Sequence, residues 1–200
     1  MLLNSIIIIP IIASLLIGFL GKDYLRLNYF IALSSSLIVF LLSLYLLYLF
    51  DPLSTEYQFQ TQMNWITQFN IQYFIGIDGI SLPLILLTTF ITPLVIITSN
   101  TSQKKDLHQY LAAFLILETL MIGVFSSLDA FLFYIFWEAM LIPMFIIIGV
   151  WGGKNRIYAT VKFFLYTFLG SVFMLLALIY LYFKTGSYAI NDFYNANLSL

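Results

Sequence analysis

Six apolar runs, each long enough to cross a bilayer, follow one another along the chain. They cover residues 2–20, 29–50, 80–98, 109–128, 130–151 and 158–183. About 20 apolar residues are what a helix needs to span the hydrocarbon core. Because a spanning segment must satisfy its own backbone hydrogen bonds, each run is expected to be a helix. The pattern predicts an all-α integral membrane protein, with six transmembrane helices in a single membrane domain over residues 1–200.

The connection over residues 51–79 has a different period. Apolar and polar residues alternate along residues 57–65 and again along residues 69–75, as in Met63-Asn64-Trp65. Strict alternation of this length is typical of a half-buried strand. We therefore expect an amphipathic β-hairpin that turns near Ile66 and Thr67. It should lie on the outer surface and cover the helix ends, which is a structural role rather than a ligand site.

Charged residues in the connections indicate how the chain is oriented. Every second connection is basic, which puts the basic connections on one side of the membrane, the inner side. Their basic residues are Lys22, Arg26, Lys104, Lys105, Lys154 and Arg156, with Lys162 nearby. The other side carries the acidic Asp51, Glu56, Asp78 and Asp129, together with Lys184. Short loops rich in lysine and arginine stay on the side from which a membrane protein is inserted. Both chain termini are therefore expected on the opposite, outer side.

Composition narrows the function classes. The 200 residues are 62% hydrophobic and 8% charged, whereas soluble domains are roughly a quarter charged. A net charge of −1 excludes a basic nucleic-acid binder. One histidine and no cysteine exclude thiolate metal sites, iron–sulfur clusters and disulfides within the chain. We expect no metal or cofactor site and no redox chemistry in this chain itself.

The apolar run over residues 131–145 carries one carboxylate, Glu138, near its middle. A dozen apolar residues at about −0.3 to −0.6 kcal/mol each outweigh one acidic residue at about +2.5 to +3.5 kcal/mol, so the segment still inserts. Ionisable groups at this depth usually serve ion or proton movement. Glu138 is therefore predicted to be a buried proton-titrating group. The alternative is a hydrogen-bonded glutamate that only holds helices together.

A second carboxylate, Glu118, lies in the preceding apolar run. It precedes the short turn at Leu128-Asp129 by about ten residues, and Glu138 follows that turn by about nine. At about 1.5 Å per residue, both carboxylates lie roughly 14 Å from the turn. If they face one another, Glu118 is a possible second proton carrier. If they face different ways, it is a helix-packing residue, and the sequence leaves the rotation of its helix open.

Lys162 is the only cation inside an apolar run. Counted from the inner helix ends, it lies about 9 Å deep and Glu138 about 20 Å deep, so a direct ion pair would be strained. The simpler interpretation is that its ammonium group reaches the inner membrane surface. A water-bridged relay between Lys162 and Glu138 is the functional alternative.

Several stretches together carry a resemblance to a known family. They are residues 76–82 (GIDGISL), 86–93 (LLTTFITP), 132–143 (LFYIFWEAMLIP), 149–152 (GVWG) and 162–167 (KFFLYT). They resemble the antiporter-like membrane subunits of respiratory complex I, in particular the subunit 4 family of mitochondrial NADH dehydrogenase and its bacterial counterparts. The resemblance covers about residues 58–182, and the first two apolar runs match only as hydrophobic spans.

This resemblance implies a subunit that moves a proton when quinone reduction elsewhere in the complex drives it. The family's helix-5 glutamate matches Glu138, while Glu118 lies in no equally firm motif. Flavin, iron–sulfur clusters and quinone would belong to other subunits. The resemblance further implies the mitochondrial inner membrane, with both termini in the intermembrane space, and as partners membrane lipids and the other membrane subunits, without nucleic acid.

Length is the main departure from the family, whose members are more than twice as long. The part without a counterpart here carries a broken helix and the lysines that pair with the helix-5 glutamate. We expect a second polypeptide to carry this C-terminal half, as in a split gene, although a fragment of one gene is the alternative. Two other functions stay open: a subunit of a multisubunit sodium/proton antiporter, and a purely architectural half-subunit.

Overall fold

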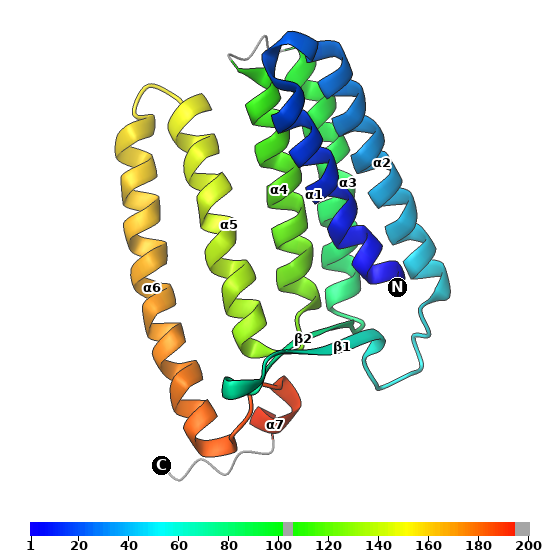
Figure 1. The fold of residues 1–200 in the computed structure, drawn as a ribbon, viewed down its shortest axis with the longest axis vertical. Helices are drawn as coiled ribbons and strands as arrows, with labels where there is room; N and C mark the ends of the chain where they lie inside the picture. The colour runs from blue at the N-terminus through cyan, green and yellow to red at the C-terminus, as the bar shows by residue number, and fades with distance from the viewer. Residues whose placement is uncertain (102–105, 195–200) are drawn as a thin grey trace.

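The computed structural model describes residues 1–101 and 106–194, so Lys104 and Lys105 lie outside the described residues. Six long helices carry the fold (Figure 1). They are α1 (Leu2–Leu20), α2 (Leu25–Leu49), α3 (Ser81–Thr101), α4 (Leu107–Ser126), α5 (Ala130–Trp151) and α6 (Arg156–Thr185). The smaller elements are η1 (Gly21–Tyr24), β1 (Gln58–Ile66), η2 (Thr67–Phe69), β2 (Ile71–Ile77) and α7 (Ile190–Tyr194).

The predicted helical membrane fold is confirmed. Five segments of the described chain are long and apolar enough to cross a membrane, and the first of them, Leu2–Leu49, contains both α1 and α2. The 3₁₀ turn η1 reverses the chain between these two helices. Gly21 has a φ of 68° and its carbonyl accepts a 2.7 Å hydrogen bond from the side chain of Asn28. This turn is tighter than the predicted linker of residues 21–28, because residues 25–28 already belong to α2.

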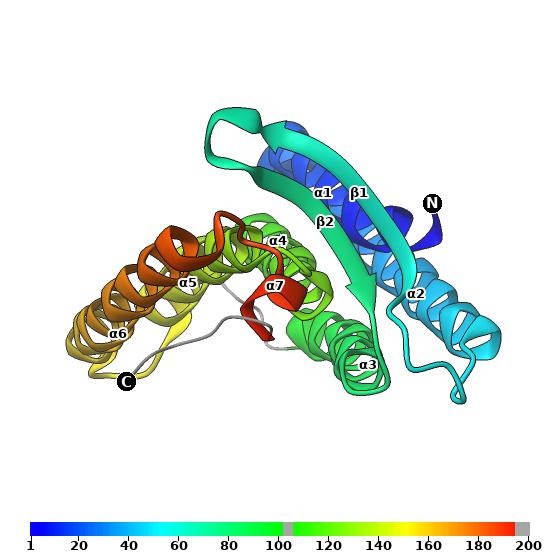
Figure 2. The ribbon, with the colours of Figure 1, turned by 90° about the horizontal axis from the view of Figure 1, so that it is seen from below.

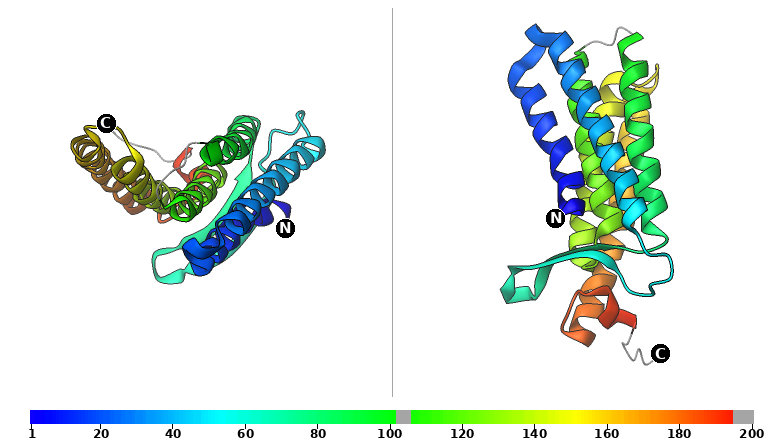
Figure 3. Two further views of the ribbon diagram at one scale, coloured as in Figure 1. Left: turned by 90° about the horizontal axis from the view of Figure 1, so that it is seen from above. Right: turned by 90° about the vertical axis from the view of Figure 1, so that its right-hand side faces the viewer.

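Helices α1 to α4 pack into one bundle (Figure 3). Its core has two clusters of buried side chains, one of which contains Ile6 of α1 and the other Ile17. Hydroxyl groups add contacts between helices: Ser43 and Thr89 lie 2.7 Å apart, and Thr119 donates to the carbonyl of Ile7 at 3.2 Å. Interhelical hydrogen bonds of this kind hold helices together where the surrounding lipid is as apolar as the side chains.

The predicted β-hairpin is present and lies across one end of the bundle (Figure 2). Its two antiparallel strands are joined by η2, which places the turn where the sequence indicated. Tyr73 donates to Asn4 of α1 at 2.9 Å, so the hairpin covers the start of that helix. The predicted apolar face is only partly covered, because Met63 and Trp65 are 56% and 52% exposed. They lie toward the turn, which extends beyond the bundle (Figure 2).

Helices α5 and α6 extend the bundle on one side of α4 and leave much of their surface open. Figure 2 shows α4 at the corner between α3 on one side and α5 and α6 on the other. In the most apolar 18-residue stretch of each helix, 17% of α5 and 6% of α6 is buried, compared with 61% of α4. The N-terminus of α1, the hairpin and α7 lie toward the same end of the molecule (Figure 1).

Gly123 of α4 is where α5 comes closest. A Cβ atom added to this glycine would lie 2.6 Å from the ring of Phe136. Small residues allow helix backbones to approach in this way within membranes. We expect Gly123→Ala to destabilise the protein by about 1–3 kcal/mol, because the ring and the helix must move apart. Thermal unfolding measures the change.

The matched control is Gly170→Ala in α6, where an added Cβ atom has nothing within 4 Å. This variant should be neutral or slightly stabilising, because alanine forms helix more readily than glycine by about 1 kcal/mol. Equal stability loss in both variants would show that the contact between Gly123 and Phe136 does not hold α4 and α5 together.

Candidate functional site

Glu138 lies in the middle of α5, facing α6. The side chain is half-buried, and its Oε1 atom is fully buried without a hydrogen-bond partner among the described residues. Tyr134, one turn earlier on α5, interacts through its hydroxyl with both the Glu138 carboxylate and Ser171 of α6. A carboxylate with a free buried oxygen and a phenol beside it is able to take up and release a proton.

The contacts between α5 and α6 place Lys162 well away from this group. Gly149 lies against Thr160, and the rings of Phe145 and Phe164 are 5.6 Å apart. This register puts Glu138 level with Ser171, nine residues farther along α6 than Lys162. The separation along the helix is about 14 Å.

Lys162 itself is exposed, and its ammonium nitrogen lies 5.1 Å from the centre of the Tyr158 ring. Tyr158 lies one turn nearer the start of α6. A long cationic side chain that points toward the helix end agrees with the interpretation that the charge reaches the membrane surface. A role for Lys162 as a relay stays a prediction.

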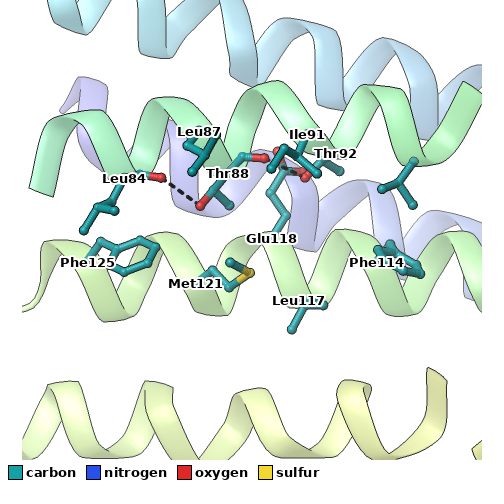
Figure 4. A pocket seen from close by; sticks show the side chains of 11 residues that line it. Leu84, Leu87, Thr88, Ile91, Thr92, Phe114, Leu117, Glu118, Met121 and Phe125 are labelled. Carbon is teal, nitrogen blue, oxygen red and sulfur yellow. Dashed lines mark hydrogen bonds between the residues drawn. The ribbon is translucent and has the colours of Figure 1, made fainter. Parts of the chain in front are cut away.

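Glu118 is much more deeply buried than Glu138, with 1% of its surface exposed. It points from α4 toward α3, into a cavity of about 240 Å³ between the two helices (Figure 4). Thr92 of α3 lies beside the carboxylate, but its hydroxyl donates to the carbonyl of Thr88 at 3.0 Å. Within the described chain, neither carboxylate oxygen of Glu118 has a hydrogen-bond partner. The cavity is otherwise almost entirely apolar, since the rest of its lining is mostly leucine, isoleucine, phenylalanine and methionine.

The two carboxylates are close in depth but face different ways. Contacts of Gly123 with Phe136 and of Tyr110 with Trp151 set the register of α4 against α5. This register places Glu138 level with Ile122, about one turn or 6 Å from the level of Glu118. Because Glu118 points at α3 while α5 lies on the other side of α4 (Figure 4), the chain does not form the facing pair that would make one shared site.

Sequence reasoning missed three residues of these surroundings. Thr92 and Ser171 were not singled out, although a hydroxyl residue in an apolar span is a signal for contacts between helices. Asp129 was noted only as an outer-side charge and as part of the short turn. Its position directly before an apolar run is also typical of a helix N-cap, and its carboxylate does accept hydrogen bonds from the amides of Phe131 and Leu132. In the described ranges, no group of three or more metal-binding side chains comes together.

Two known families together match residues 1–199 of the chain. Residues 1–126 match the family described as NADH-ubiquinone oxidoreductase chain 4, amino terminus. Residues 127–199 match the transmembrane family described as NADH:quinone oxidoreductase/Mrp antiporter. The boundary between the two matches falls in the turn that joins α4 to α5, so Glu118 and Glu138 lie in different family regions.

Individual relatives agree with these families. The chain is 46% identical to NADH-ubiquinone oxidoreductase chain 4 of Arabidopsis thaliana, over 92% of this chain and 38% of that protein. It is 47% identical to NADH-quinone oxidoreductase subunit M of Rickettsia prowazekii, over 84% of this chain and 34% of that protein. The chain thus corresponds to little more than a third of the length of these relatives.

Solved structures share the fold of this chain. A chain of respiratory complex I from Thermus thermophilus superposes with a TM-score of 0.83 at 24% identity, over all of this chain and 40% of that one. A chain of the archaeal membrane-bound sulfane sulfur reductase superposes with a TM-score of 0.79 at 22% identity, over 96% of this chain and 29% of that one. This multi-pass membrane protein therefore belongs to the NADH-ubiquinone oxidoreductase chain 4 family.

Proposed function

We propose that this chain is part of a proton-translocating membrane subunit of respiratory NADH:ubiquinone oxidoreductase, with Glu138 as the group that binds and releases the proton. The observation that carries the proposal is the setting of Glu138 midway along an apolar helix, with a buried oxygen that lacks a partner in the described chain and a phenol one turn away. Intramembrane carboxylates of this kind usually serve proton or ion movement. Membership of the family indicates which electron-transfer reaction would drive proton movement, namely the oxidation of NADH by quinone.

Glu118 has a separate place in this proposal. It is a second carboxylate on the α3 side of α4, and it serves the same pathway rather than a shared pair with Glu138. A buried carboxylate without hydrogen-bond partners opposes stability, so holding helices together is a poor reason for its presence. Lys162 takes the minor role of a residue that carries positive charge near the inner membrane surface.

The same proposal names the partners. These are the other membrane subunits of the complex, membrane lipids, and the lysine-bearing remainder of the family's length, whether a second polypeptide or the same chain carries it. The weakly buried α5 and α6 offer a surface on which such a remainder can pack. Flavin, iron–sulfur clusters and quinone belong to other subunits. The expected location is the mitochondrial inner membrane, with both termini on the intermembrane-space side.

A second candidate is a subunit of a multisubunit sodium/proton antiporter, because the description of the family that matches residues 127–199 also names an antiporter. The match over residues 1–126 and the relatives in plants and Rickettsia favour the respiratory complex. In the antiporter, the chain would work without flavin or iron–sulfur subunits. This difference gives a direct test.

Purification of the tagged chain from its own membranes in a mild detergent tests the assignment. The expected result is a large assembly that contains flavin and iron–sulfur clusters and that oxidises NADH with a quinone acceptor. The control is the same preparation from membranes with the untagged chain. A particle that lacks flavin and exchanges sodium for protons would instead establish the antiporter.

A further inference from the structure

Asp129 is a buried carboxylate to which the proposed proton path gives no role. It lies in the turn between α4 and α5, with 1% of its surface exposed. Its Oδ1 atom accepts hydrogen bonds from the amides of Phe131 and Leu132, each at 2.9 Å, and so caps the start of α5. Its Oδ2 atom accepts a third hydrogen bond, at 3.0 Å, from the amide of Gln72 in β2. One carboxylate therefore joins the start of α5 to the hairpin.

The backbone around Asp129 is bound on both sides. Leu128 donates to the carbonyl of Phe74 at 2.8 Å, which pairs the turn with β2. Ala130 donates to the carbonyl of Tyr188 at 2.8 Å, and Ile190 donates to that of Leu128 at 3.1 Å, which pair the turn with the segment after α6. The turn thus lies between the hairpin and the segment after α6, and Asp129 supplies the side-chain hydrogen bonds that join the start of α5 to β2.

We infer that Asp129 is a positioning residue, whose contact with Gln72 sets the height and rotation of α5 and thereby places Glu138 and its neighbour Tyr134 level with Ser171 of α6. The inference rests on the proposed function of Glu138. Nine residues of continuous helix, about 14 Å, separate Asp129 from Glu138. A helix of this length transmits a shift or a rotation at its first turn to the carboxylate.

Asp129→Ser in the assembled complex separates the two contacts of the carboxylate. Serine is a good N-cap, so the amides of Phe131 and Leu132 keep an acceptor, but it has no second oxygen for Gln72. We expect hydrogen exchange of the Gln72 amide to rise about tenfold or more while α5 stays protected. The pH at which NADH-driven pumping is half-maximal should shift by about half a unit or more, because the Tyr134 hydroxyl beside Glu138 is displaced from Ser171 of α6.

Asp78→Ser is the matched control. Asp78 caps α3 with bonds from the amides of Ile80 and Ser81, at 3.1 and 2.7 Å, and these bonds are local. Burial raises the pKa of Asp78, but the hydrogen bonds from Ser81 and Ile80 outweigh burial and hold this pKa below its ordinary value. This variant loses one oxygen of an N-cap but no contact between α5 and the hairpin. The half-maximal pH of pumping should therefore match that of the wild type.

The outcomes separate the inference from the function on which it rests. Faster exchange at Gln72 with an unchanged half-maximal pH would overturn the positioning role and leave the function of Glu138 intact. Unchanged pumping in Glu138→Gln would remove the function itself. If the Asp129→Ser variant does not assemble, the same two measurements are made on Asp129→Asn. This variant keeps a capping oxygen but presents an N–H donor to the amide of Gln72. Failure of both to assemble would assign Asp129 to folding alone.

Discussion

Glu138→Gln is expected to abolish NADH-driven proton movement while the complex still assembles. The amide has nearly the shape of the carboxylate, but it does not bind and release a proton near neutral pH. Loss of a positioned proton-transfer group typically lowers a rate by about 10²–10⁴-fold, so residual pumping should be about 1% or less. Proton uptake by membrane vesicles during NADH oxidation measures the effect.

Assembly should persist because an uncharged amide is less costly to bury than a carboxylate. Glu138→Ala should give the same loss of pumping. Glu56→Gln is the matched control, since it makes the same change at an exposed position between α2 and β1 and should leave pumping unchanged. Coupled activity at the wild-type level in Glu138→Gln would instead make this chain an architectural half, with all proton chemistry elsewhere.

Most of the fold was predictable from the sequence, because both the long apolar runs and the alternation of apolar and polar residues are clear. Runs of about 20 apolar residues mark the helices, and the alternation on either side of Ile66 marks the hairpin. The ends of helices were less predictable. Residues 25–28 were expected to belong to a polar linker, because they contain Arg26 and follow Lys22 and Asp23. The hydrogen bond from Asn28 to Gly21 lets the helix begin earlier.

The site was predictable only as far as hydropathy determines it. A lone carboxylate in an apolar run identifies Glu138, because its insertion cost has to be balanced by its neighbours. The direction of Glu118 was not predictable, since α4 packs against α1, α3 and α5 and is apolar on all of these faces. A helix that is apolar all round has no pattern that shows which neighbour a given residue faces.

Glu118→Gln is expected to raise the stability of the protein and to lower pumping. Within the described chain, both oxygens of Glu118 are buried without a hydrogen-bond partner, in a cavity lined almost entirely by apolar side chains. Replacing the carboxylate by a neutral amide removes the cost of burying a charge but leaves the amide without partners in the same cavity, which predicts a gain of about 1 kcal/mol or less in the free energy of unfolding. Pumping should fall about tenfold, less than in Glu138→Gln, because Glu118 does not share a site with Glu138.

Opposite changes in stability and activity are what distinguish a functional carboxylate from a packing residue. A group retained for function at the expense of stability gives a more stable and less active protein when it is removed. Glu118→Met serves as a control, because its apolar side chain suits the cavity and should raise stability further while pumping falls equally. Thermal unfolding and proton uptake, measured on the same preparations, report the two quantities. Loss of stability in Glu118→Gln with pumping unchanged would make Glu118 a packing residue of α3 and α4.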